Sequence, residues 1–566
     1  MRCQLSPRLV VLFALATLLL TYRYYGRWLA EKLFKLSDTD ETPAQTKNDG
    51  YDFVPTDKHV LVGHHFASIA GLGPIVGPAI AVIWGWLPAF IWIVFGAALI
   101  GAVHDFSSLV LSVRHDGGSV GDVAKRVVNG RARLAFLAVI FFMLSLAMGV
   151  FVHVIALLFS APPGGKAYYP EAVFPSMALM VIAMISGYCL HKKGYPLRAV
   201  TAVGVTLMLL SIYGGITLPA PALSADAWKA PLLLYAFVAS VLPVWLLLQP
   251  RDYINAFELY LGGFLLYLGF FVLGPSFQAP AINGSPKDLP ALLPFLFITL
   301  ACGACSGFHS LVSSGTTAKQ LAKEKDALPV GFGSMLGEAA LAVIVLMACA
   351  CGAASVEAWN SHYASFAAAS GLGPKLAAFV NGAARFMAAV GVPTAIGANF
   401  IAVVVVSFAL TTLDSATRLL SYVIEEFISA VGMKKLPHSR ALSSLGAALA
   451  IGYFAFMKIG NKPAGLALWQ LFGVTNQLLA GLGLLIATVY LVRLKRPALP
   501  TFLPMVFMFA ISLWAIVLKL KSFYNQGGQT HLLVVGSVVT FLALWLVFEA
   551  TLVTVSLLRG TKKVAV

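Results

Sequence analysis

Long apolar runs fill most of this sequence and constrain its fold more than any other feature. Runs of about 17–25 residues with few charges recur along the chain, and each is long enough to cross a bilayer as a helix. The candidate runs lie near residues 8–22, 63–84, 89–112, 134–160, 174–190, 198–217, 231–249, 254–274, 290–316, 328–351, 394–428, 441–457, 464–492, 501–519 and 531–558. We therefore expect an all-α polytopic membrane protein with about fifteen transmembrane helices.

The composition excludes a soluble protein and argues against a nucleic-acid-binding one. Hydrophobic residues make up 59% of the chain and charged residues only 11%, whereas soluble domains have about 45–50% apolar and about 25% charged residues. The net charge of +16 comes mainly from Lys and Arg in short loops between apolar runs. That placement fits a protein whose partner is the lipid bilayer, not a nucleic acid.

The chain divides into three parts by its apolar runs. Residues 1–58 are expected to form one transmembrane helix and a cytoplasmic connector, residues 59–430 a ten-helix transport core, and residues 431–566 additional helices. The first apolar stretch could also be a signal peptide. It lacks a small-x-small cleavage site before Thr21, so we interpret it as a retained helix.

Basic residues gather in alternate connectors, which predicts the orientation of the chain. The segments 23–58, 113–131 and 319–326 are rich in Lys and Arg, as is the carboxyl tail. Because such residues accumulate on the cytoplasmic side of a membrane, we expect the amino terminus outside and the carboxyl terminus in the cytoplasm.

One apolar run contains a cluster of helix breakers and two histidines. His64, His65 and Ser68 precede Gly71 and Gly73. A broken helix exposes backbone amides at membrane depth, which is tolerated where they line a cavity or bind a ligand. We expect these five residues to bind substrate, with a substrate carboxylate at the half-helix amino end near Gly71 and Gly73. The alternative is a Gly-rich packing face with the histidines at the water interface.

A second run is unusually rich in hydroxyl groups. Ser306 and His309 are expected to contact substrate. The hydroxyl residues that could bind a coupling ion are Ser313, Ser314, Thr316 and Thr317. Cys302 and Cys305 form a CxxC pair, which indicates redox or metal chemistry in a soluble protein. On a membrane helix the same spacing places two small residues on one face.

Ionisable residues inside apolar runs are costly and usually functional. Asp105 and Glu338 lie within such runs, and we assign Asp105 to the coupling-ion site. Asp414 and Arg418 are one helical turn apart, which predicts a structural ion pair. Arg251 and Asp252 are interpreted as an interfacial pair.

Five stretches together resemble the carbon starvation protein A family of bacterial inner-membrane transporters. They are GHHFASIAGLGPIVGP at 63–78, GAVHDF at 101–106, CGACSGFHSLVSSGTT at 302–317, TTLDSATRL at 411–419 and WQLFGVTNQLLA at 469–480. The resemblance implies import of short peptides or small carboxylates such as pyruvate during carbon starvation, with proton coupling for some members. We expect a proton, or alternatively sodium, as the coupling ion, and no cofactor or metal.

The resemblance also implies a core of two inverted five-helix repeats with broken first and sixth helices. If the core begins at Gly63, the sixth helix is 231–249 and the eighth is 290–316. The histidines titrate near neutrality when unperturbed, so they could carry the coupled proton.

Two other classes of function compete with a transporter. One is a membrane redox, haem or metal protein that uses His64 and His65 with Cys302 and Cys305. The other is a starvation sensor or channel without coupled transport, although no sensor domain is visible. The sequence carries no signal for the oligomeric state.

The predicted orientation can be tested at the loop 319–326. Because this loop is basic, a cysteine placed by Lys323→Cys should be reached by an impermeant thiol reagent only from the cytoplasmic side. Labelling from outside intact cells would mean that the topology is inverted.

Overall fold

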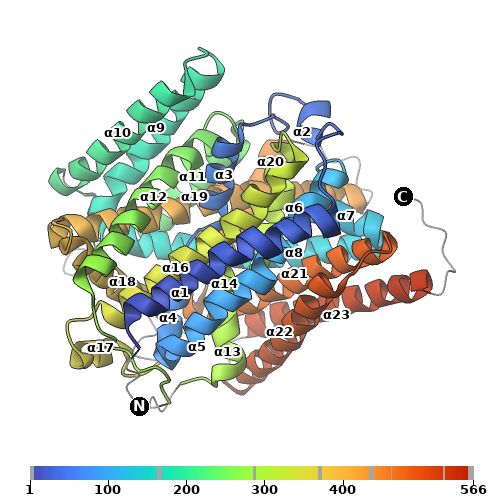
Figure 1. The fold of residues 1–566 in the computed structure, drawn as a ribbon. Coiled ribbons are helices and arrows are strands. Elements are labelled where there is room, and N and C mark those ends of the chain that lie inside the picture. The colour runs from blue at the N-terminus through green and yellow to red at the C-terminus, as the bar shows by residue number, and fades with distance from the viewer. Residues whose placement is uncertain are drawn as a thin grey trace.

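The computed structural model describes residues 5–161, 168–218, 220–284, 289–366, 372–431, 439–459, 462–463, 465–526 and 530–558. These residues form helices, apart from a hairpin of two-residue strands (Figure 1). In the first half the helices are α1 (Pro7–Leu20), η1 (Thr21–Gly26), η2 (Leu29–Phe34), α2 (Pro43–Thr46), α3 (Lys58–Ile69), α4 (Gly73–Ala81), η3 (Val82–Trp84), α5 (Trp86–Ile91), η4 (Trp92–Gly101), α6 (Ala102–Arg114), α7 (Val120–Val127), α8 (Gly130–Phe159), η5 (Pro170–Ala172), α9 (Val173–His191), α10 (Leu197–Thr217), α11 (Ala225–Val241) and α12 (Leu248–Leu273). In the second half the elements are α13 (Leu292–Thr299), α14 (Ala301–Ala304), α15 (Gly307–Gly315), η6 (Thr317–Lys319), η7 (Glu324–Asp326), η8 (Leu328–Gly333), α16 (Ser334–Cys351), α17 (Val356–Tyr363), α18 (Leu372–Ala388), α19 (Thr394–Ala430), α20 (Arg440–Ala455), β1 (Lys458–Ile459), β2 (Lys462–Pro463), α21 (Gly465–Arg493), α22 (Leu499–Gln526) and α23 (Thr530–Leu558).

Eleven helices in the described part of the chain are long and apolar enough to cross a membrane, and the bent pair α3 and α4 makes a twelfth if it counts as one span. The expected count of about fifteen is therefore not confirmed. The remaining predicted runs correspond to α11 and α20, which are short, and to α13–α15, which is interrupted. The chain is an all-helical, multi-pass membrane protein.

The centre of the molecule consists of helices covered on all sides. In their most apolar windows, 94% of residues are buried in α21 and 89% in α19, against 28% in α10 and 28% in α23. The long helices α8 and α19 pack against each other. Helices α11 and α20 also pack against both. Figure 1 shows α9 and α10 as a hairpin at one edge, while α22 and α23 lie at the opposite edge.

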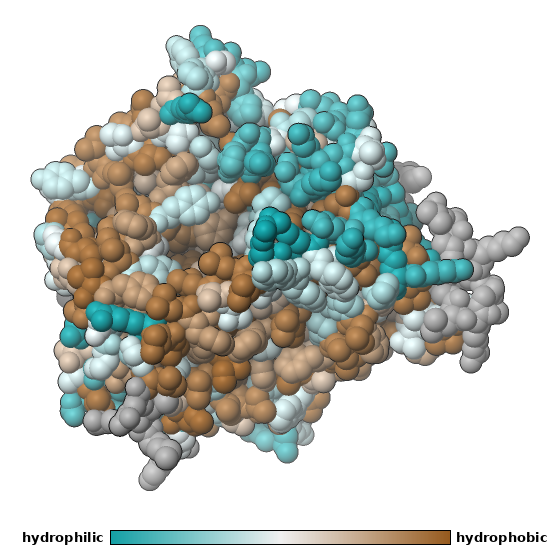
Figure 2. Space-filling view, viewed as in Figure 1, coloured by the Kyte–Doolittle hydropathy of each residue, from teal (hydrophilic) through white to brown (hydrophobic). Residues whose placement is uncertain are grey.

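Apolar side chains on the outer helices face outward. Leu210 and Tyr213 on α10, and Phe541 and Phe548 on α23, are largely exposed. Figure 2 shows brown, hydrophobic surface over much of the visible face, with a hydrophilic region at the end near α2 and α7. A bilayer is the environment in which such outer faces are stable.

Three of the basic connectors meet at this hydrophilic end. The guanidinium of Arg114 donates to Glu324 at 2.6 Å. The ammonium group of Lys47 forms an ion pair with the carboxylate of Asp116. Thr56 bridges to the segment after η6. Connectors that the sequence assigns to one side of the membrane therefore lie together. Two further basic segments that the sequence assigns to the same side of the membrane, 434–435 and the tail from 559, lie outside the described residues.

Two glycines on α12 offer a direct test of helix packing. A Cβ atom at Gly269 would lie 2.0 Å from the carbonyl oxygen of Phe386 on α18, whereas one at Gly263 would meet nothing within 4 Å. We expect Gly269→Ala to destabilise the protein by about 1–3 kcal/mol because the two backbones must separate. Thermal unfolding in detergent should show this loss.

Gly263→Ala is the matched control on the same helix. Since its added methyl group meets open space, its unfolding temperature should equal or slightly exceed that of the wild type. Equal unfolding temperatures for both variants would contradict the close approach of α12 and α18.

Candidate functional site

Two helices of the core are interrupted at membrane depth. The first consists of α3 and α4, which are bent by 43° around residues 70–72. Gly71 lies in the bend and Gly73 begins α4, and Pro74 is tolerated in the first turn of α4 because no backbone donor is needed there. The second consists of α13, α14 and α15, with Cys305 and Ser306 in extended conformation before α15. The sequence predicted the first break as observed.

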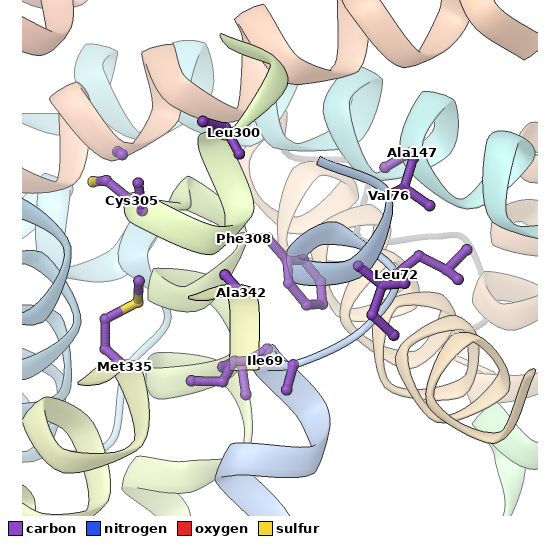
Figure 3. Packing of buried hydrophobic residues seen from close by; sticks show 14 of the residues in the cluster. Ile69, Leu72, Val76, Ala147, Leu300, Cys305, Phe308, Met335 and Ala342 are labelled. Atoms are coloured by element: carbon purple, nitrogen blue, oxygen red, sulfur yellow. The ribbon is translucent and has the colours of Figure 1, made fainter. Parts of the chain in front are cut away.

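The two breaks lie against each other. A Cβ atom at Gly73 would lie 2.0 Å from the Cβ of Cys302, so only glycine permits this approach. A Cβ at Gly71 would lie 2.3 Å from the hydroxyl of Thr412 on α19. Figure 3 shows Leu72 of the first break near Phe308 of the second, with Ala342 of α16 in the same cluster. Both interrupted helices therefore meet in a tightly packed centre.

His309 on α15 lies between two buried carboxyl groups. Its Nδ1 atom is 2.7 Å from Asp105 Oδ2 on α6, and its Nε2 atom is 3.3 Å from Glu338 Oε2 on α16. The other oxygen of Asp105 is 2.8 Å from Nδ1 of His104. All four side chains are fully buried. The imidazole of His309 thus connects α15, at the second break, to α6 and α16.

A neutral imidazole cannot donate a hydrogen bond to a carboxylate on each side of its ring. A neutral histidine has one donor nitrogen and one acceptor nitrogen, whereas a carboxylate only accepts. With Asp105 and Glu338 on opposite sides of the ring, good hydrogen bonding requires an imidazolium or a protonated carboxyl. The cluster can therefore hold one proton and exchange it when a partner moves away.

The predicted histidine pair points in two directions. Nδ1 of His64 is 2.8 Å from Asp252 on α12, and Ser68 donates to the same carboxylate oxygen at 3.1 Å. Nδ1 of His65 is 2.8 Å from the hydroxyl of Thr317. The interpretation of Asp252 as an interfacial residue is wrong, because its side chain is fully buried.

The polar residues predicted to act in the second run form hydrogen bonds with different partners. Asn476 on α21 accepts from Ser306 at 3.2 Å and from the backbone amide of Phe308 at 2.8 Å. The amide group of Asn476 thus satisfies a backbone donor that the break leaves free. The Thr316 hydroxyl donates to the carbonyl of Val312 within α15. The Ser313 hydroxyl, although buried, has no hydrogen-bond partner in the described residues.

The predicted ion pair between Asp414 and Arg418 is wrong. Asp414 on α19 pairs with Arg251 at the start of α12 and accepts from the hydroxyl of Tyr235 on α11. Arg418 contacts Asp52 in the first connector at 3.4 Å. Helical spacing places Asp414 and Arg418 near each other, but each finds a charged partner from another element that completes its burial.

The geometry gives no support to the redox alternative. Cys302 and Cys305 are free thiols, and the Sγ of Cys302 contacts the Asn476 amide. Among the described residues, no group of three or more His, Cys, Asp or Glu side chains is placed to hold a metal ion.

Sequence reasoning left four residues of this network out of the site. Asp252, Arg251 and Glu338 were visible as charges in apolar runs, and Asn476 as an amide in one. The free-energy cost of burying these polar side chains in a membrane was a usable signal of function. Their partners, however, come from distant segments of the chain. No local spacing predicts such contacts.

Broken helices, buried ionisable side chains and many spans are typical of membrane transporters. The family model described as carbon starvation protein CstA matches residues 7–369 and 353–515, so this chain belongs to that family.

The chain is also similar to curated transporters over most of its length. It is 34% identical to the peptide transporter CstA of Campylobacter jejuni, covering 92% of this chain and 81% of that one. It is 32% identical to the pyruvate/proton symporter BtsT of Escherichia coli, and the match covers 92% of this chain and 82% of BtsT. It is 32% identical to the peptide transporter CstA of Bacillus subtilis, covering 95% of both chains.

Solved structures show a weaker likeness. A manganese transporter of Eremococcus coleocola covers 90% of this chain and 99% of its own, with a TM-score of 0.47 and 12% identity. The structure of MhsT in complex with L-phenylalanine covers 86% of this chain and 99% of its own, with a TM-score of 0.42 and 13% identity.

Asp414→Asn should lower the amount of folded protein. The change leaves Arg251 buried without a full counter-charge, and breaking a buried ion pair costs about 3–5 kcal/mol. Asp116→Asn is the control, because Asp116 pairs with Arg126 at an exposed site where an ion pair contributes about 0–1 kcal/mol. Size-exclusion yield and thermal unfolding in detergent measure both.

The double variant Arg251→Met with Asp414→Asn should recover part of the loss, because no charge remains uncompensated. If Asp414→Asn folds normally and only transport is lost, Asp414 belongs to the transport pathway instead.

Proposed function

We propose that this protein is a secondary transporter that imports a small carboxylate such as pyruvate, or a short peptide, together with a proton. The observation that carries the proposal is His309 between Asp105 and Glu338, next to two adjoining helix breaks. The names of two relatives, a peptide transporter and a pyruvate/proton symporter, support the same class of substrate. An enzymatic role has no comparable support.

The packing supports a core of two inverted five-helix repeats. The first repeat comprises α3–α4, α5–α6, α8, α11 and α12, and the second comprises α13–α15, η8–α16, α19, α20 and α21. Helix α12 packs on α3 as α21 packs on α15, and α4 packs on α16 as α15 packs on α6. The hairpin of α9 and α10 is then an insertion in the first repeat.

This assignment changes two expectations from the sequence. The broken sixth helix is 292–315 instead of 231–249, and the core extends from residue 58 to 493 instead of ending at 430. Asp105 and Glu338 then lie on the second helix of each repeat. One imidazole between equivalent carboxyls is suited to a proton that both halves of the core can bind.

The substrate site belongs at the two breaks. The amino end of α4, at Gly73, presents free backbone amides that favour an anion. His64, His65, Ser68 and Gly71 lie on the same broken helix, and Ser306 and His309 lie at the facing break. A carboxylate near Gly73 would therefore be within one site with the proton cluster.

The coupling ion is a proton rather than sodium in this proposal. Asp105 is already engaged by two histidines, and Thr316 and Thr317 have hydrogen-bond partners. Of the four predicted hydroxyl residues, Ser313 is buried without a partner and Ser314 lines a cavity, and two hydroxyl groups are too few ligands for a cation.

We place the protein in a bacterial inner membrane with the basic connectors in the cytoplasm. The connectors 23–58, 113–131 and 319–326 lie at one end of the molecule, which fits the alternation of charge along the sequence.

Reconstituted protein should accumulate labelled pyruvate or dipeptide when an inward proton gradient is imposed. His309→Gln keeps a hydrogen-bonding side chain but cannot titrate. We expect it to retain exchange of substrate across the membrane and to lose accumulation driven by the pH gradient. Uptake and counterflow in proteoliposomes measure the two activities separately.

His531→Gln is the control, because His531 lies on the outer helix α23 and is exposed. It should behave as wild type. Accumulation by His309→Gln at the wild-type level would remove the proton role of this cluster, and sodium-dependent uptake at fixed pH would favour sodium coupling.

A further inference from the structure

A cavity of about 420 Å³ lies between the helix breaks and the hydrophilic end of the molecule. Ser314 and Gly315 of α15 form part of its wall, as do Tyr422 of α19 and Phe53 of the first connector. Thr317, which bonds His65, is two residues before another wall residue, Lys319. The cavity is therefore adjacent to the proposed transport site but separate from it.

Lys319 differs from the other cations of this cavity. Its ammonium group lies 4.5 Å from the ring centroid of Tyr422 and 5.5 Å from that of Phe53. No carboxylate in the described residues comes within ion-pair distance of it. Burial lowers the pKa of Lys319, and the more distant carboxylates of Asp52 and Glu426 offset this only in part.

The acidic residues of the wall mostly have other partners. The ion pairs are Asp52 with Arg418 and Arg440, Asp116 with Lys47 and Arg126, and Asp122 and Glu426 with Arg133. The one remaining carboxylate of the wall, Glu425, has no ion pair in the described residues. Lys319 is thus an available positive charge between two aromatic rings, in a space large enough for a small organic anion.

We propose that Lys319 forms a second binding site, which holds the carboxylate of the transported substrate in the vestibule between the helix breaks and the aqueous phase. The proposal rests on the proposed function, because the ligand is the transported carboxylate itself. An ammonium group binds a carboxylate as a point charge, and the rings of Tyr422 and Phe53 limit its exposure to water. The site lies on one side of the transport site only.

Counterflow of labelled pyruvate, measured from each face of oriented proteoliposomes, tests this position. Lys319→Gln should raise the half-saturating concentration about tenfold or more on the face that carries residues 47–53, which is the loss expected for a charged hydrogen bond. On the opposite face the half-saturating concentration should stay unchanged. Lys319→Arg should retain most of the wild-type behaviour.

Lys47→Gln is the matched control at the rim of the same cavity. Lys47 already contacts Asp116, and its side chain is 46% exposed, so this change should leave both faces unaffected. A normal half-saturating concentration for Lys319→Gln on both faces would overturn the vestibule site. An equal change on both faces would place Lys319 in the central site instead.

A measurement on the wild-type protein avoids any folding defect of the variants. Pyruvate should slow modification of Lys319 by an amine-reactive reagent, read by mass spectrometry, and leave modification of Lys47 unchanged. Absence of protection at Lys319 overturns the proposal. If the wild type exchanges neither pyruvate nor dipeptides, the proposed function fails, whereas exchange without protection removes only the vestibule site.

Discussion

The imidazole of His309 between Asp105 and Glu338 fixes the centre of this protein. In hydrocarbon an unpaired charge is costly, so α6, α15 and α16 must stay in register to keep the two carboxyl groups beside the imidazole. That register brings the interrupted ends of α14 and α15 against the bend between α3 and α4. The glycine at position 73 permits the contact, because any side chain there would collide with Cys302.

The same need for partners explains the other polar contacts of the core. Asp252 on α12 binds His64 and Ser68 of the first broken helix, and the preceding residue, Arg251, binds Asp414 of α19. The start of α12 therefore ties the first broken helix to α19. Movement of the first broken helix must exchange or break these contacts, and in the proposed transport cycle the proton and the substrate carboxylate would replace them.

Particular residues show where sequence reasoning succeeded and where it failed. The break near Gly71 and Gly73 was predictable, because glycine and proline act on their own segment of backbone. The pairing of Asp414 with Arg418 was predicted from one-turn spacing and is wrong. The spacing of residues along one helix gives no information about a cation that another helix contributes. Asn476 satisfies a backbone donor at a break far away in the sequence, and no local pattern identifies that partner.

The sequence alone determined that the chain is a bundle of membrane helices, where most of them lie and that the helix near Gly71 and Gly73 is interrupted. These properties depend on local hydrophobicity and on backbone preferences, which each segment carries within itself. Only the tertiary structure decided which buried charges lie together, which form ion pairs and which cation of the vestibule, Lys319, has no carboxylate within ion-pair distance among the described residues. The physical reason is that a buried charge takes the partner that three-dimensional packing brings closest, and packing joins residues hundreds of positions apart.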